Sequence, residues 1–161
     1  MRPLKKKPKN QEALFSRSGS MARVIERSIR AAKISIDVAL YRLSHPRLVR
    51  ALHDAPLRGV RVRIILDRKK YETTPATKKL LGKFPLPYRL NSGRAGRYAK
   101  MHHKFAVLDG GTALAGSYNW TPESEEQNYE NLIILREPEQ VKRFVKEFNA
   151  LWSAPQKRRR S

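Results

Sequence analysis

Apolar and polar residues alternate along this chain with two different periods. Stretches with the shorter period are followed by stretches with the longer one, in turn along the sequence. A period of two marks an expected β-strand, because successive side chains of a strand point to opposite faces of its sheet. Stretches that alternate in this way, or short apolar runs of strand length, span residues 34–40, 60–67, 88–90, 102–108, 112–118 and 130–136. Apolar residues spaced three and four apart mark expected helices at residues 21–32, from 46 to near 59, 74–83 and 138–151. Strands that alternate with helices predict an α/β fold, with one mixed, largely buried β-sheet flanked by helices on both faces.

Single residues sharpen the boundaries of these helices. The Ser20 side chain can cap the helix that follows it, and Pro46 and Pro138 suit the first turn of a helix. The aromatic residues of the last helix fall on its apolar stripe, so we expect them to pack in the core rather than to stack on bases. The polar stretch 121–128 is expected to be mobile. The chain is thus divided into a flexible basic N-terminal tail (1–11), a single domain (12–155) and a basic C-terminal tail (156–161).

Composition adds a strong charge imbalance to this picture. The 161 residues contain 35 Lys and Arg against 14 Asp and Glu, a formal net charge of +21. Residues 58–104 alone hold fourteen basic and two acidic side chains. A surface that only keeps a protein in solution normally mixes both signs, so we expect a polyanionic partner, with nucleic acid ahead of an anionic membrane.

Other features exclude several classes of protein. The chain contains no cysteine, which excludes disulfides and zinc–thiolate sites. It has neither a run of 18 apolar residues nor an apolar segment behind its basic start, so no stable membrane anchor and no secretory signal are expected. We therefore expect a cytoplasmic protein, with secretion after processing as the alternative that stays open.

The candidate chemistry lies in the segment from Met101 to Asn119, which reads H-x-K-x4-D-x6-G-S-x-N. On a strand, His102 and Lys104 share one face, while His103 points the other way and is expected either to pack or to be a solvated neighbour. The turn Asp109-Gly110-Gly111 can return the chain as a hairpin, on which Ser117 and Asn119 share a face. Such a hairpin gathers an imidazole, an ammonium, a hydroxyl and an amide, which suits a phosphoryl group. A lone His-x-Lys usually means a packed histidine beside a solvated lysine, but the complete array favours a function.

This array resembles the signature of the phospholipase D superfamily, and specifically its short single-motif members, the bacterial nonspecific endonucleases and the Zucchini-type endonucleases or cardiolipin hydrolases. The resemblance implies that residues 12–155 form a phospholipase D-like catalytic domain. It implies a homodimer, since short members pair two identical chains to build one composite active site. It implies that His102 is the nucleophile, that a phosphohistidine forms, and that the partner's His102 is the general acid and then the general base. Lys104 and Asn119 match the family's phosphate binders and Ser117 the motif hydroxyl, and neither a metal nor another cofactor is implied.

Two carboxylates complete the expected site. Glu130 lies thirteen residues past Ser117, where the short nucleases place a carboxylate that hydrogen-bonds the second nitrogen of the histidine. The alternative for Glu130 is a surface charge at the end of a strand. Asp109 lies in the motif but at a turn, so we expect it to pair with a basic neighbour or to cap the turn, with an indirect effect on activity.

The leading hypothesis is a metal-independent endonuclease that cleaves DNA, and RNA as a further candidate, with little sequence specificity, because its site reads phosphate rather than base edges. The absence of cysteine means that the zinc-binding insertion of the Zucchini type is missing, which favours a soluble microbial-type nuclease. Two alternatives stay open: hydrolysis of a phospholipid such as cardiolipin, and a nucleic-acid-binding module without catalysis. The choice between DNA and RNA, and between single and double strands, is open as well.

Overall fold

A single seven-stranded sheet runs through residues 10–96 and 98–155, the part of the chain that the computed structural model describes. Its strands are β1 (Gln11–Phe15), β2 (Ser35–Leu40), β3 (Arg61–Asp67), β4 (Tyr88–Asn91), β5 (Lys104–Leu108), β6 (Thr112–Gly116) and β7 (Asn131–Leu135). They lie in the order β1-β7-β6-β5-β2-β3-β4. The sheet is mixed, because β2, β3 and β4 are parallel while the other neighbours are antiparallel.

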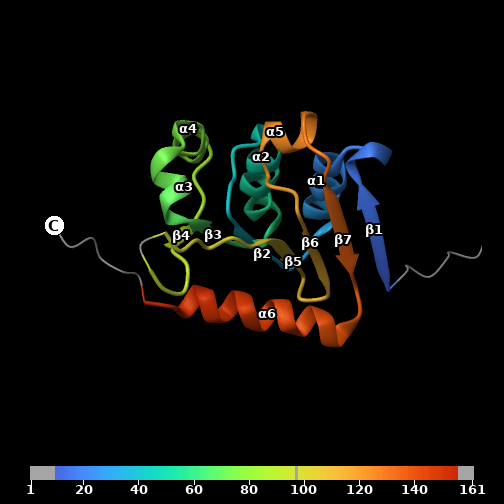
Figure 1. Ribbon diagram of the computed structural model, residues 1–161. Helices are drawn as coiled ribbons and strands as arrows, with labels where there is room; N and C mark the ends of the chain where they lie inside the picture. Colours follow the sequence, from blue (N-terminus) through green and yellow to red (C-terminus); the bar gives the residue numbers. More distant parts are fainter. Residues whose placement is uncertain (1–9, 97, 156–161) are drawn as a thin grey trace, which may run out of the picture.

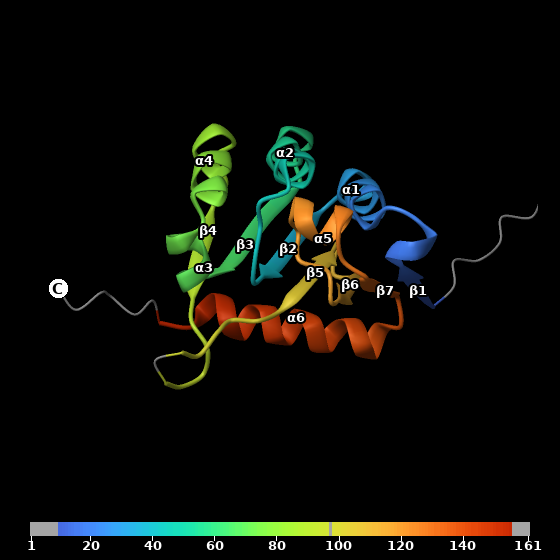
Figure 2. The ribbon, with the colours of Figure 1, turned by 45° about the horizontal axis from the view of Figure 1, so that its top comes forward.

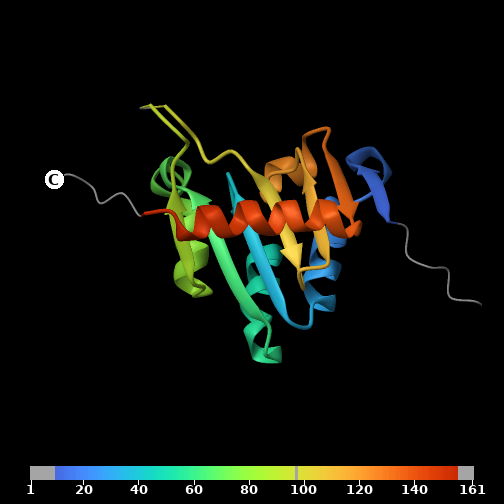
Figure 3. The ribbon, with the colours of Figure 1, turned by 90° about the horizontal axis from the view of Figure 1, so that it is seen from below.

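Helices cover both faces of this sheet (Figures 1 and 2). One face carries α1 (Met21–Ala31), α2 (Pro46–Asp54), α3 (Arg68–Thr73), α4 (Pro75–Lys83) and α5 (Pro122–Glu126), with short 3₁₀ turns at Ser16–Ser18 and Pro56–Arg58. The long helix α6 (Pro138–Ser153) crosses the strands on the opposite face (Figure 3). The predicted α/β fold with a mixed, buried sheet between helices is therefore confirmed.

Two apolar layers explain why the middle of the sheet is buried on both sides. Ile25, Ile29 and Leu48 of α1 and α2 pack against one face, and Val141 and Phe148 of α6 pack against the other. All six residues of β2 are buried as a result, including two polar ones. One of these is Asp37, whose carboxylate accepts hydrogen bonds of 2.7 and 2.8 Å from the Arg63 guanidinium. A buried charge needs such a partner, because burying it without one costs much free energy.

Several predicted boundaries are confirmed by the structure. The hydroxyl oxygen of Ser20 caps α1 by accepting a 3.1 Å hydrogen bond from the backbone N–H of Arg23. Prolines occupy the first turns of α2, α4 and α6. The predicted hairpin is present, with β5 and β6 antiparallel around the turn at Asp109.

Four other features differ from the prediction. Strand β1 was not predicted, and it begins at Gln11, the last residue of the expected N-terminal tail, while residues 1–9 and 156–161 lie outside the described residues. Helix α3 was not predicted, and the polar stretch 121–128 contains the helix α5. The strand expected at 102–108 begins only at Lys104. These elements depend on partners far along the chain: β1 pairs with β7, and the Glu125 carboxylate of α5 accepts a 3.0 Å hydrogen bond from Ala22 N–H at the start of α1.

Candidate active site

The motif residues meet at one edge of the sheet. The carboxyl ends of β2 and β6 and the amino end of β5 lie at this edge, because β5 is antiparallel to both neighbours. His102 therefore precedes β5 at the same edge at which Ser117 and Asn119 follow β6. The backbone N–H of Tyr41, just past β2, donates a 2.8 Å hydrogen bond to the carbonyl of His103 and fixes the approach to β5.

His102 and Lys104 lie side by side at this edge. The Lys104 Nζ is 3.3 Å from His102 Nδ1, and it donates a 2.9 Å hydrogen bond to the carbonyl oxygen of His102. Partial burial lowers the pKa of His102, and the positive charges of Lys104 and Lys100 lower it further. Burial also lowers the pKa of the Lys104 ammonium. An imidazole held in its neutral form has a free nitrogen lone pair, which a nucleophile requires.

His103 lies on the other face, as predicted. Its Nε2 is 2.9 Å from a carboxylate oxygen of Glu147 on α6, and its ring contacts Phe105 with 5.3 Å between centroids. The side chain is part of the packing between β5 and α6 and does not face the candidate site.

The Ser117 hydroxyl is held by the strand that follows it. Its oxygen accepts a 3.0 Å hydrogen bond from Asn131 N–H, and the hydroxyl donates to the Glu130 carboxylate. Gly116 lets the two strands approach here, since a Cβ at this position would come within 2.2 Å of the Asn131 carbonyl oxygen. Asn119 is half-buried, and its Oδ1 is buried without a hydrogen-bond partner in the described part of the chain.

Glu130 reaches this site through Ser117 and not through the imidazole of its own chain. Besides the Ser117 hydroxyl, its carboxylate accepts a 3.2 Å hydrogen bond from the Asn128 side chain. Its negative charge also acts on Lys104, where it raises the pKa against the effect of burial. The predicted contact between Glu130 and His102 is thus not made within this chain.

Asp109 lies at the far end of β5. Its carboxylate accepts hydrogen bonds from the backbone N–H groups of Lys33, Ile34 and Ser35, at 2.7 to 3.1 Å. Burial acts to raise the pKa of Asp109, but these hydrogen bonds outweigh it and lower the pKa. The residue ties the hairpin to the segment that enters β2, well away from His102.

Two side chains at the site escaped the sequence analysis. The ring of Tyr41 lies against the His102 ring, with 4.4 Å between centroids. Asp67 is fully buried at the end of β3 and accepts 2.9 Å hydrogen bonds from the backbone N–H groups of Lys70 and Met101. It therefore fixes the residue directly before His102. In both cases the signal was an aromatic or acidic residue placed immediately at the end of a buried strand.

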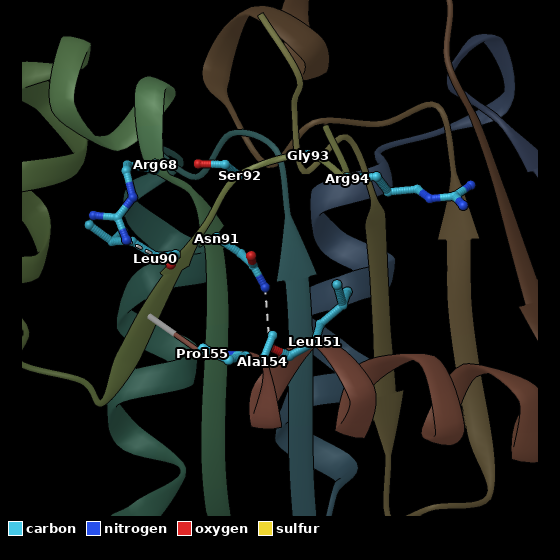
Figure 4. A pocket seen from close by; sticks show the side chains of 9 residues that line it. All are labelled: Arg68, Leu90, Asn91, Ser92, Gly93, Arg94, Leu151, Ala154 and Pro155. Atoms are coloured by element: carbon cyan, nitrogen blue, oxygen red, sulfur yellow. Dashed lines mark hydrogen bonds between the residues drawn. The ribbon is translucent and has the colours of Figure 1, made fainter. Parts of the chain in front are cut away.

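The candidate site is open to solvent. The side chains of His102 and Ser117 are exposed. A cavity of about 330 Å³ lies nearby, between the end of β4 and the end of α6 (Figure 4), but none of the motif side chains lines it. Arg68 and Asn91 at that cavity bond to the backbone carbonyls of Leu90 and Leu151, so they hold the wall together.

Neither a metal centre nor a membrane segment is found in the described residues. Within residues 10–96 and 98–155, no three His, Cys, Asp or Glu side chains are grouped so that they could hold a metal ion. In the same ranges no helix has the length and apolar character needed to cross a bilayer.

Comparisons with known proteins agree with this geometry. Residues 25–152 match the family model described as the PLD-like domain of cardiolipin synthase. The mitochondrial cardiolipin hydrolase of Danio rerio is 36% identical over 135 residues, which are 84% of this chain and 58% of that protein. The protein of the same name from Canis lupus familiaris is 35% identical over 133 residues, 83% of this chain and 50% of its own length. The chain thus spans about half the length of the curated relatives it matches.

Solved structures match over nearly the whole length of the chain. A phospholipase D family member, Nuc from Salmonella typhimurium, has a TM-score of 0.79 and 28% identity, with 92% of this chain and 95% of that chain covered. NucT from Helicobacter pylori has a TM-score of 0.77 and 24% identity, with 88% and 96% covered, and supports the fold alone.

Proposed function

The chain belongs to the phospholipase D-like family of phosphodiesterases, and we propose that it is a metal-independent endonuclease that cleaves DNA, and RNA as a second substrate. The observation that carries the proposal is the contact between His102 and Lys104 on an open, strongly basic surface. A neutral imidazole supplies the nucleophile, and the ammonium beside it can stabilise negative charge on a phosphoryl oxygen.

The reaction proceeds in two displacements. A ring nitrogen of His102 attacks phosphorus, the bond from phosphorus to the leaving oxygen breaks, and the partner's His102 gives its proton to that oxygen. Water then attacks the phosphohistidine, the partner's His102 takes a proton from this water, and the P–N bond breaks to release a phosphate monoester and free His102. This is covalent catalysis combined with general acid–base catalysis.

A homodimer with a composite site is part of this proposal. Two observations support it: His102 and Ser117 are exposed in one protomer, and the Glu130 carboxylate makes no contact with His102 of its own chain. An isologous pairing, the commonest arrangement of two identical chains, would bring two copies of this edge together. In that arrangement Glu130 would reach the partner's His102 and fix its tautomer.

Lys104, Ser117 and Asn119 bind the scissile phosphate in this proposal. Two copies of Lys104 would supply the positive charge that many nucleases obtain from metal ions. The unsatisfied Oδ1 of Asn119 belongs to an amide whose NH₂ group can donate to a phosphoryl oxygen. Asp109 takes no direct part, because all its contacts lie at the far end of β5.

Hydrolysis of cardiolipin is the second candidate function. It is favoured by the relatives named mitochondrial cardiolipin hydrolase, and the same chemistry would serve a phospholipid phosphodiester. Basic surfaces also bind anionic bilayers. These relatives are named as mitochondrial, so a cytoplasmic location stays a prediction for this chain.

The experiment that tests the proposal is cleavage of plasmid DNA, single-stranded oligo-DNA and RNA in excess EDTA, with wild type beside His102→Ala. We expect metal-free cleavage by wild type and a loss of roughly 10⁴-fold or more in the variant. Cardiolipin vesicles, assayed in parallel for release of phosphatidic acid, test the second candidate.

Each outcome points to one function. Nucleic-acid cleavage that disappears in EDTA contradicts the metal-independent mechanism. Release of phosphatidic acid without nucleic-acid cleavage establishes the lipid hydrolase instead. Tight but inert binding of nucleic acid, equal in wild type and His102→Ala, would identify a non-catalytic binding module.

A further inference from the structure

Three lysine ammonium groups surround the ring of Tyr41. The Nζ atoms of Lys104, Lys70 and Lys100 lie 5.3, 5.5 and 6.0 Å from its centroid. Only Lys104 belongs to the sequence motif. The other two come from the first turn of α3 and from the segment between β4 and β5, which crosses the ends of β3 and β2 (Figure 3).

The positions of the two additional lysines are built into the fold. One buried carboxylate, that of Asp67, accepts from the backbone N–H of Lys70 and from that of Met101, the neighbour of Lys100. The same group therefore fixes the backbone at both lysines and next to His102. The bond from Lys70 is the N-cap of α3, and the bond from Met101 ties the segment before β5 to the same carboxylate, so the fold itself brings the two lysines together.

These charges are not paired with acids at ion-pair distance, although the more distant Glu130 raises the pKa of Lys104. None of Lys70, Lys100 and Lys104 takes part in the ion pairs found among residues 10–96 and 98–155. The face of the Tyr41 ring offsets a small part of their mutual repulsion. Like charges held this close favour binding of an anion that lies between them.

We propose that Lys70 and Lys100 form a second phosphate subsite beside His102, which takes the phosphodiester next to the scissile one in a nucleic-acid strand. The proposal rests on the proposed nuclease function. It explains why the enzyme would prefer a substrate with several phosphodiesters to one with a single phosphodiester. Because both Nζ atoms lie within about 11 Å of Lys104 Nζ, a strand with its scissile phosphate at Lys104 brings a neighbouring phosphate into their range.

The surface beyond the subsite suits the continuation of such a strand. A cavity of about 500 Å³ opens between α3 and the segment after β4, and its lining includes Arg68, Lys69 and Tyr98. The Tyr98 ring is 72% exposed, and the Nζ of Lys69 lies 5.7 Å from its centroid. An exposed aromatic ring beside cations is a surface on which a base can stack.

The test compares substrates with one phosphodiester and with several. Thymidine dinucleotide and longer thymidine oligomers are cleaved in EDTA by wild type, by the double variant Lys70→Gln/Lys100→Gln and by the control Lys146→Gln, which removes the charge of an exposed lysine on α6. We expect kcat/KM of wild type and control to rise about tenfold from dinucleotide to oligomer, and the double variant to lose this rise. An equal rise in all three proteins overturns the proposal.

Binding gives a second readout that does not depend on cleavage. Fluorescence anisotropy of a labelled single-stranded oligomer, with each protein in the His102→Ala background, yields the slope of log Kd against log salt. Losing the one phosphate contact of this subsite lowers the magnitude of this slope by about 0.7, the contribution of each neutralised phosphate of a single strand. An unchanged slope overturns the subsite, and matching melting curves of the variants establish that they are folded.

The two readouts separate failure of the subsite from failure of the nuclease proposal. If wild type cleaves no nucleic acid in EDTA but the slope falls in the double variant, the subsite stands and the nuclease mechanism fails. If the double variant loses binding only to cardiolipin vesicles and keeps its oligomer slope, the anion at this site is a lipid headgroup and the strand proposal is overturned.

Discussion

At the amino end of β5, His102 is exposed, and the Lys104 ammonium beside it forms no ion pair within residues 10–96 and 98–155. At its carboxyl end, Asp109 is enclosed by backbone N–H groups that satisfy both of its carboxylate oxygens. Both ends of β5 belong to one sequence motif. Their polar groups differ in whether they already have partners within the chain. The open end can gain free energy only by binding an anion, whereas the closed end has already made its hydrogen bonds within the fold.

This difference separates chemistry from support within a single motif. A group whose partners all lie in its own chain contributes mainly to stability, and a charged group without such partners marks a place where a ligand or a second protein binds. Substitutions at the two ends should therefore change different measurements.

Removing the charge of Lys104 should give the largest effect. Lys104→Gln keeps most of the length of the side chain but cannot balance charge on the phosphoryl group, so we expect kcat to fall roughly 10³-fold. The free energy of unfolding should change by no more than about 0.5 kcal/mol, because the side chain makes no buried ion pair.

Steady-state cleavage and thermal melting of the same sample measure both quantities, and Lys146→Gln is the matched control. A large loss of stability in Lys104→Gln, with normal turnover of the protein that remains folded, would contradict the assignment of catalysis to the amino end of β5.

Glu130→Gln should have an intermediate effect on activity. The neutral amide can still accept from the Ser117 hydroxyl but orients an imidazole less well than a carboxylate does, so kcat should fall roughly ten- to a hundredfold. Glu126→Gln removes an exposed carboxylate of α5 and serves as the control. Equal activity of the two variants would assign Glu130 to the surface of the strand end.

Asp109→Ala should show the reverse pattern. It leaves the N–H groups of Lys33, Ile34 and Ser35 without their acceptor, which costs about 2 kcal/mol of the free energy of unfolding. A positive backbone φ of 54° at this position adds to the cost for alanine. Turnover of the folded protein should stay within about twofold of wild type.

Denaturant unfolding and cleavage below the melting transition test this pair of expectations. Asp109→Asn, which keeps one acceptor and suits a positive φ, should recover part of the stability. If Asp109→Ala melts like wild type but loses activity, Asp109 has a catalytic role. The two ends of β5 are then not divided between chemistry and stability.

The sequence predicted those features that depend on near neighbours in the chain. Ser20 and the prolines at the helix starts act within one turn, and the Asp109-Gly110-Gly111 turn brings β5 and β6 together. The convergence of His102 with Ser117 followed from that hairpin alone. Physical rules of short range were sufficient for all of these.

Features that depend on distant partners could not be obtained in this way. β1 exists because β7, more than a hundred residues later, offers its edge. The lysines around Tyr41 meet only because Asp67 joins two separate segments. The contact of Glu130 with Ser117, instead of His102, depends on side-chain geometry that spacing alone does not determine.

The smallest expected effect is a shift in pH dependence at the open end. In the proposed mechanism the attacking His102 is neutral and the partner's His102 is protonated, so kcat/KM should fall at both low and high pH. The fall at low pH follows the pKa of the attacking imidazole. Burial and the charges of Lys104 and Lys100 lower this pKa, so the low-pH fall should lie below pH 6.5, the ordinary value for histidine. Lys100→Gln removes one of these charges and should move the low-pH fall toward higher pH, whereas Lys146→Gln should leave it in place. A low-pH fall that lies above pH 6.5 in wild type, or one that Lys100→Gln does not move, would mean that the imidazole titrates in surroundings other than those at the edge of this sheet.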